Sequence, residues 1–251
     1  MKRVMLTIAY DGTNYCGWQT QKNGLAVEEV INNTLSEMLG EDICVIGASR
    51  TDAGVHAMGN VAVFDTDSRI PADKFSYALN QRLPDDIVIQ SSCQVDDGFH
   101  PRHCNSTKTY EYKILNRRFP MPTERLYSHF LYYNLNIKKM QDAADYLVGT
   151  HDFKSFCSVN TQVKDTIRTI FSINVEKSDE TVKIRVSGNG FLYNMVRIIS
   201  GTLIQAGTGQ INPEDVKTML EAKDRNAAGP TAPARGLTLV GIKYEKREKK
   251  I

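Results

Sequence analysis

The chain has 251 residues, of which 41% are hydrophobic and 24% are charged, a composition typical of a folded globular protein rather than a disordered one. No run approaches the roughly 18 consecutive apolar residues that span a bilayer, and the five cysteines include no C-x-x-C pair. We therefore expect a cytoplasmic protein with reduced thiols and no membrane association, while the net charge of +2 by itself neither shows nor excludes a nucleic-acid partner.

The first half of the chain alternates between strand and helix patterns. Residues 2–10 place Val4, Leu6 and Ile8 on one face, which is the period-2 pattern of a strand. Residues 26–39 carry apolar side chains at helical spacing. The predicted order is strand, helix, strand, strand, helix, strand, over residues 2–10, 26–39, 43–49, 60–64, 71–83 and 86–94.

The second half repeats that order with one additional helix. Its predicted strands cover residues 107–116, 167–176, 181–187 and 237–244, and its helices cover 137–148, 191–206 and a segment that begins at Asn212 and Pro213. Each half fits a βαββαβ ferredoxin-like unit. We therefore predict an α+β fold of two halves, residues 1–104 and 105–251, whose sheets pair into an extended antiparallel sheet with a groove between them.

The segment GASRTDAGVHA at residues 47–57 is the strongest candidate for a catalytic loop. Glycines on both sides allow sharp turns, so that Arg50, Thr51 and Asp52 can project from the end of a sheet. An isolated Asp-Ala-Gly more often forms a turn in which the aspartate bonds its own backbone. An arginine two residues before Asp52 and a histidine four residues after it nevertheless concentrate reactive groups in one loop.

This loop resembles the catalytic loop of the tRNA pseudouridine synthase A family, and further segments resemble other motifs of that family in the same order. They are YDGTNYCGWQTQ at 10–21, the stretch at 79–88, FHPR at 99–102, the Y-x-Y strand within 108–114, NGFLYNMVRIISG at 189–201, and the segment at 229–239. The departures are Pro101 where the family has alanine, Ser49 where glycine is common, Glu28 where glutamine is usual, and an unusually polar segment at residues 103–107.

The resemblance implies an isomerase that converts uridine to pseudouridine in the anticodon stem-loop of tRNA, at positions 38, 39 and 40, as a homodimer. The reaction breaks the bond between ribose C1′ and uracil N1, rotates the base and rejoins it through C5. No electrons are exchanged, so no cofactor or metal is expected. The resemblance assigns the catalytic carboxylate to Asp52, which could attack C1′ or C6 or act as a base on the sugar.

The resemblance also implies substrate-binding roles for Tyr110, Arg197, Phe191 and Leu192. Arg197 would keep Asp52 ionised, because a nearby cation favours the charged carboxylate. The ring of Tyr110 would stack on the flipped uracil and its hydroxyl could move a proton, whereas Phe191 and Leu192 could wall the pocket or equally be simple packing. Arg50 would fill the space that the flipped base leaves or hold the flanking phosphate. Without the resemblance, a lone arginine on an apolar helix more often snorkels to water, and a tyrosine on an alternating strand is more often core.

Two other interpretations stay open. A βαββαβ unit is also the shape of RNA-recognition modules, which bind without catalysis, although the sequence has no cluster of aromatic residues like theirs. Alternatively, His100, His103 and Cys104 could be metal ligands, although they lack a matching second pair at zinc spacing.

Overall fold

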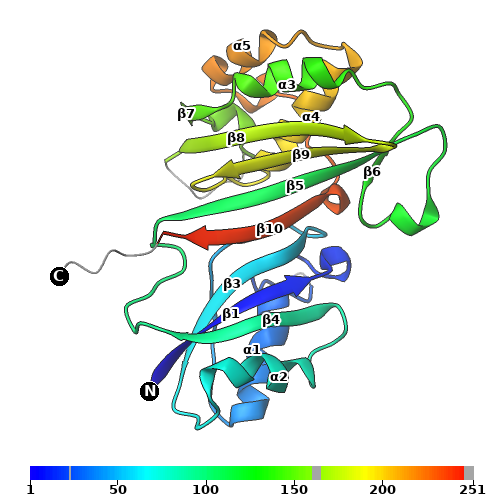
Figure 1. Cartoon of the computed structure of the whole chain (residues 1–251). Coiled ribbons are helices and arrows are strands. Elements are labelled where there is room, and N and C mark those ends of the chain that lie inside the picture. The colour runs from blue at the N-terminus through cyan, green and yellow to red at the C-terminus, as the bar shows by residue number, and fades with distance from the viewer. Residues whose placement is uncertain (23, 160–164, 246–251) are drawn as a thin grey trace. The chain divides into compact units, whose positions relative to one another are not determined.

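The computed structural model describes residues 1–22, 24–159 and 165–245, and the chain divides into two compact units (Figure 1). The first unit contains Met1–Ser106 together with the chain from Leu239 onwards, and the second contains Thr107–Thr238. Both units combine helices with mostly antiparallel strands, which confirms the predicted α+β class. None of the helices in the described part of the chain has the length and apolar character needed to cross a bilayer.

The first unit follows the predicted order of strands and helices. Its central strand is β1, which pairs antiparallel with β3 on one side and β4 on the other (Figure 1). Strand β2 pairs antiparallel with β3. Val4, Leu6 and Ile8 are fully buried, as the alternation in the sequence predicts. The elements are β1 (Lys2–Tyr10), α1 (Val27–Leu39), β2 (Ile46–Gly47), β3 (His56–Thr66), α2 (Phe75–Asn80) and β4 (Ile87–Val95).

The second strand of this unit is much shorter than predicted, because side chains of α1 take the backbone amides that a longer strand would use. Oγ of Ser36 accepts a hydrogen bond from the Ile43 amide at 3.0 Å, and Oδ1 of Asn32 accepts one from the Val45 amide at 2.9 Å. The strand predicted over residues 43–49 is therefore reduced to β2. The following strand, β3, begins at His56 rather than at residue 60.

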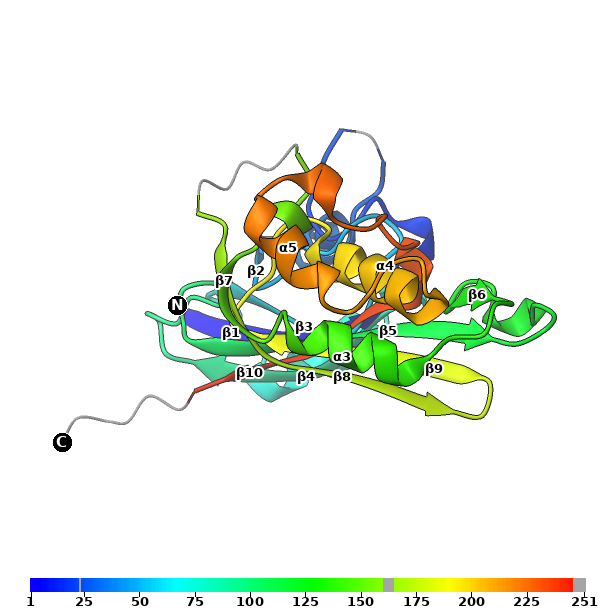
Figure 2. The ribbon, with the colours of Figure 1, turned by 90° about the horizontal axis from the view of Figure 1, so that it is seen from above.

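The second unit is built on four antiparallel strands in the order β5-β9-β8-β7, and β6 pairs parallel to β5. The predicted hairpin is confirmed as β8 and β9, which turn at Asp179 with φ +52°. Figure 2 shows α4 and α5 on one side of these strands. The elements are β5 (Ser106–Asn116), β6 (His129–Leu131), α3 (Ile137–Asp145), β7 (Gly149–Asp152), β8 (Ile167–Ser178), β9 (Thr181–Gly188), α4 (Met195–Thr208) and α5 (Asp215–Ala222).

Three features of the second half differ from the sequence prediction. Helix α4 begins at Met195 and not near Phe191, because Asn194 adopts a left-handed conformation with φ +60°. The short strands β6 and β7 were not predicted. The last strand, β10 (Leu237–Tyr244), has the predicted bounds, but it pairs with β3 and lies mostly in the first unit. Of the predicted charged tail at 245–250, residues 246–250 lie outside the described residues.

Candidate active site

The loop between β2 and β3 holds its side chains in alternating directions. Arg50 is exposed, Thr51 is buried and Asp52 is partly exposed. The Val55 amide donates to the Asp52 carbonyl over 3.1 Å, and Gly54 has φ +75°, so the chain reverses directly after Asp52. Arg50 and Asp52 are thus the more exposed residues on either side of buried Thr51.

The N-terminal motif at residues 10–21 packs directly against this loop. Two of its glycines leave no room for a side chain: a Cβ on Gly12 would lie 2.0 Å from the Val55 carbonyl oxygen, and one on Gly17 would lie 2.5 Å from that of Thr51. The Trp18 amide also donates to the Thr51 carbonyl oxygen over 3.1 Å. The two motifs, 37 residues apart at their starts, therefore form one structure.

The histidine of the loop, His56, binds the C-terminal end of the loop to the N-terminal motif. His56 is buried at 6% exposure, and its Nδ1 accepts a hydrogen bond from the Gly12 amide over 3.1 Å. The same nitrogen lies 3.0 Å from Oδ1 of Asp11, a distance that would mark an ion pair if the ring were protonated. The same Asp11 oxygen accepts hydrogen bonds from the amide and the hydroxyl of Thr13. His56 thus joins the loop to the N-terminal motif.

In the second unit, Tyr110 lies on β5 and meets the side chain of Phe191. The ring centroids are 5.3 Å apart and the planes are nearly perpendicular at 86°. Tyr110 is 6% exposed, Leu192 is likewise 6% exposed, and Phe191 is partly exposed. Tyr112, two residues along the same strand face, is fully buried and donates its hydroxyl to the Pro233 carbonyl over 2.9 Å, as expected for a core tyrosine.

Arg197 is held by protein atoms rather than extended freely into water. Its Nε donates to the Ala232 carbonyl over 2.8 Å, and its Nη1 donates to Oδ1 of Asn194 over 2.7 Å. The Ala232 amide in turn donates to the Arg197 carbonyl over 3.1 Å. These contacts join the segments at 189–201 and 229–239, which both carry family resemblance. Asn194 and Ala232 were not among the predicted residues, and only their positions inside the two motifs could have indicated them.

The six predicted site residues fall into two sets. Arg50 and Asp52 lie in the first unit, whereas the second contains Tyr110, Phe191, Leu192 and Arg197. The structure describes the geometry within each set, and the expectation that both sets act on one uridine across a groove stays a prediction. Among the described residues, no group of three or more His, Cys, Asp or Glu side chains could hold a metal ion, so His100, His103 and Cys104 have no geometric support as ligands.

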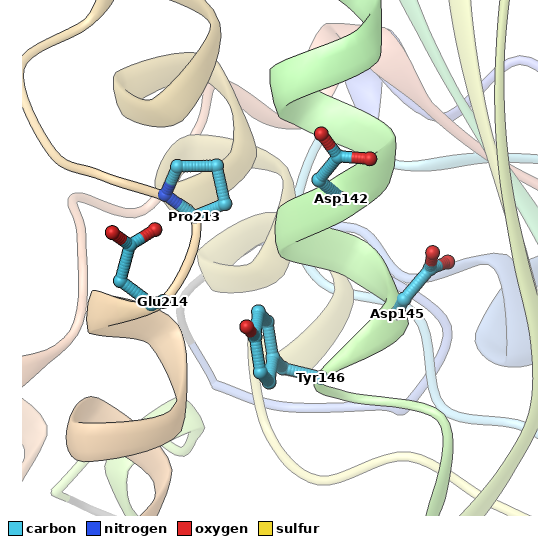
Figure 3. Close-up of a pocket in the computed structure, with 5 residues that line it drawn as sticks. All are labelled: Asp142, Asp145, Tyr146, Pro213 and Glu214. Carbon is cyan, nitrogen blue, oxygen red and sulfur yellow. The ribbon is translucent and has the colours of Figure 1, made fainter.

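The second unit also carries an open pocket between α3 and α5, which is unsuited to RNA. Three carboxylates line it and would repel phosphate groups. Its lining residues are Asp142, Asp145, Tyr146, Pro213 and Glu214 (Figure 3). We therefore place the candidate site at the two residue sets above and not at this pocket.

Comparison with known proteins points to one class of enzyme. A sequence model described as tRNA pseudouridine synthase matches residues 6–103 and 143–245. The tRNA pseudouridine synthase A of Thermoanaerobacter pseudethanolicus is 50% identical over 244 residues, covering 97% of this chain and all of the relative. The protein of the same name from Bacillus subtilis is 44% identical over 245 residues, covering 97% of this chain and 99% of the relative.

These matches extend over both units, including the loop at 47–57 and the segments at 189–201 and 229–239. They identify an isomerase of the pseudouridine synthase class. The chain belongs to the tRNA pseudouridine synthase A family. The resemblance and the enzyme class expected from the sequence are thereby confirmed.

Proposed function

We propose that this enzyme converts uridines 38, 39 and 40 of the tRNA anticodon stem-loop to pseudouridine, with Asp52 as its catalytic carboxylate. The observation that supports this most is the alternation at Arg50, Thr51 and Asp52, which turns the threonine inward and the aspartate outward on a closely packed loop. A carboxylate held in this way can approach a base that has left the helical stack.

One carboxylate suffices for the reaction. Ionised Asp52 acts as a nucleophile at C1′ or at C6, or as a base on the sugar, and all three routes need its negative charge. Rotation and reattachment of the uracil exchange no electrons with a third reactant. The proposed chemistry therefore needs no redox cofactor and no donor of a chemical group.

The remaining site residues receive substrate-binding roles. Tyr110 offers an aromatic ring, braced edge-on by Phe191, for stacking on the uracil. Leu192 contributes an apolar wall, and Arg197 contributes a positive charge whose position is fixed by Asn194 and Ala232. Exposed Arg50 contacts the phosphate beside the flipped nucleotide or fills the vacated space.

We further propose that the enzyme is a cytoplasmic, symmetric homodimer. Two-fold arrangements of identical chains are the commonest oligomers, and a chain with a net charge of +2 offers limited basic surface for a whole tRNA. Sedimentation analysis at working concentration tests this. A monomer with full specific activity would contradict it.

The central experiment replaces Asp52 by asparagine, which keeps the size of the side chain but is neither a usable nucleophile nor a base. Tritium release from C5-labelled uridine in tRNA measures turnover, and filter binding measures tRNA affinity. We expect Asp52→Asn to lower turnover by several powers of ten, at least about 5 kcal/mol of barrier, with affinity retained.

The matched control is Asp42→Asn, an exposed aspartate of the same unit outside the motifs, which should behave like the parent. Transcripts carrying uridine at only one of positions 38, 39 and 40 then test the substrate assignment. Normal turnover by Asp52→Asn would refute the catalytic role, and loss of binding together with turnover would return Asp52 to a role in shaping the turn.

A further inference from the structure

A chain of buried polar groups lies behind the loop that carries Asp52. The hydroxyls of Tyr10 and Thr51 share a hydrogen bond of 2.7 Å. Nδ2 of Asn60 donates to the Ser49 carbonyl over 3.0 Å and lies 3.4 Å from the Tyr10 hydroxyl. All four residues are at most 7% exposed. The group thus joins β1 and β3 to the residues on either side of Arg50.

This arrangement fixes which way the loop faces. The three residues of this stretch alternate in exposure: Arg50 is exposed, Thr51 is buried and Asp52 is partly exposed. The Thr51 side chain is bound inward by Tyr10, and the next side chain, Asp52, is the more exposed of the two. The Thr51 carbonyl is held separately by the Trp18 amide, so both the side chain and the backbone of residue 51 are anchored.

We propose that the Tyr10 hydroxyl is a positioning group for catalysis, acting through Thr51 on the direction of Asp52. Tyr10 does not touch the substrate in this scheme. Its ring already packs against Trp18, with the centroids 6.0 Å apart, and packing alone does not require a hydroxyl. The inference rests on the proposed role of Asp52 and adds a residue of the N-terminal motif to the catalytic machinery.

The chemistry of the buried group supports a specific role over general packing. A buried hydroxyl has to find a partner to offset the loss of water. Here the Asn60 amide can donate to the Tyr10 oxygen while Tyr10 donates to Oγ1 of Thr51, so the hydrogen bonds run in one direction toward the loop. Removing one hydroxyl leaves its neighbour without that bond and releases the Thr51 side chain, so that residue 51 is held by its backbone contact alone.

The test compares Tyr10→Phe, Thr51→Val and the double variant, each of which keeps the shape of the side chain. Since a misplacement of about 1 Å can cost 10²-fold in rate, we expect each single variant to lower kcat by about tenfold to 10²-fold. We expect KM and the filter-binding Kd for tRNA to change by less than about twofold, because the substrate contacts are intact. The double variant should be no slower than the slower single variant, since both break the same link.

Two further variants separate positioning from a loss of structure. Thr51→Ser keeps the hydroxyl and should retain most of kcat. Tyr244→Phe removes a comparable part-buried bond, from the Tyr244 hydroxyl to the Pro101 carbonyl, in the same unit. The Tyr244 ring contacts Phe99, and the Phe99 carbonyl accepts a hydrogen bond from Arg3. Arg3 pairs with Asp65 near the C-terminal end of β3. The loop precedes the N-terminal end of β3, so Tyr244 and the loop lie at opposite ends of this strand. Tyr244→Phe should therefore keep the parental kcat even if its melting temperature falls.

Several results would overturn the inference. They are a parental kcat in Tyr10→Phe, multiplicative losses in the double variant, or an equal loss of kcat in Tyr244→Phe at equal loss of melting temperature. If Tyr10→Phe does not fold, the kcat values of Thr51→Val and Thr51→Ser are compared instead. Equal kcat values in these two variants would contradict the proposal. If the parent is active, Asp52→Asn is inactive and Tyr10→Phe is fully active, this inference is contradicted and the proposed function is not. An inactive parent would contradict the proposed function itself.

Discussion

The side chain of Asn194 bonds Nη1 of Arg197 over 2.7 Å, although Asn194 lies in a left-handed conformation one residue before α4 begins. Its Nδ2 donates to Oγ of Ser158 over 2.8 Å. Asparagine is one of the few residues with a Cβ that adopt this backbone shape readily. The residue therefore ends the preceding turn and fixes the direction of the arginine at the same time.

Substitutions of Asn194 should separate these two effects. Asn194→Gly keeps the left-handed backbone without strain, whereas Asn194→Ala should lower the free energy of unfolding by roughly 1 kcal/mol more than Gly does. Both lose the bond to Arg197, so both should lower turnover by a similar factor, on the order of tenfold. Urea unfolding and tritium release measure the two quantities. Parental turnover in Asn194→Gly would show that Arg197 needs no such anchor.

Tyr110→Phe keeps the ring that meets Phe191 and removes only the hydroxyl. If that hydroxyl moves a proton, turnover should fall by at least about 10²-fold while tRNA affinity is retained. Tyr112→Phe is the matched control on the same strand face, because its hydroxyl bonds the Pro233 carbonyl inside the core. It should cost about 1 kcal/mol of stability without a comparable loss of turnover. Equal turnover in Tyr110→Phe and the parent would restrict Tyr110 to stacking.

Gly17→Ala should displace the loop at residues 47–57, because Gly17 packs against its backbone. Gly17 has φ +110°, and an added Cβ would lie 2.5 Å from the Thr51 carbonyl oxygen. We expect a loss of roughly 2–4 kcal/mol in the free energy of unfolding, together with reduced turnover. At Gly98 an added Cβ meets no atom within 4 Å, so Gly98→Ala should stay within about 0.5 kcal/mol of the parent. A stable and fully active Gly17→Ala would contradict the packing described here.

Stability should fall on mild acidification because of His129. Burial, with a smaller contribution from the positive charge of Arg235, lowers the pKa of His129 to about 4. In the unfolded chain the imidazole titrates near 6.5, so the unfolded state binds more protons between these values and stability rises with pH across this window. The expected difference between pH 5 and pH 7.5 is about 2 kcal/mol.

His129→Phe keeps a ring beside Tyr112, which it meets edge-on, and removes the titrating group. Urea unfolding of the parent and the variant at both pH values measures the difference. The variant should show a shallower dependence of stability on pH. Parallel dependences in the two proteins would show that another group is responsible.

Arg50→Ala tests the proposed phosphate contact. Loss of one such contact should weaken tRNA binding and reduce the slope of log affinity against log salt by about 1. Arg69→Ala is the control, since Arg69 is also exposed and follows the other end of β3. Filter binding over a range of salt concentrations gives both slopes. Identical slopes for the parent and Arg50→Ala would place the RNA elsewhere.

The parts of the fold with a strong local pattern could be predicted from the sequence. Residues 2–10 form a strand with the predicted bounds, because alternating apolar residues fill one face of it, and residues 237–244 also form a strand with the predicted bounds. The shortening of β2 could not be predicted, since it depends on Ser36 and Asn32 reaching the amides of residues from a neighbouring segment. The start of α4 was missed because the apolar run at 191–199 hides the left-handed Asn194.

The candidate site shows the same division. The loop at 47–57 was found because it concentrates reactive residues between glycines, and the resemblance named its aspartate. The support from Tyr10 and Asn60 was not found, because a buried tyrosine and a buried asparagine on strands carry no local signal of what they bind. Such contacts join residues about 40 to 50 positions apart, and only the fold brings them together.

Because Gly12 and Gly17 pack closely against the loop, the loop cannot be transferred to another protein by itself. A graft of residues 47–57 onto another scaffold would carry the reactive groups but leave behind the surface against which they are shaped. The smallest portable unit is the loop together with residues 10–18 and the two strands that hold Tyr10 and Asn60. Designers who wish to reuse this aspartate would need to transplant that whole assembly.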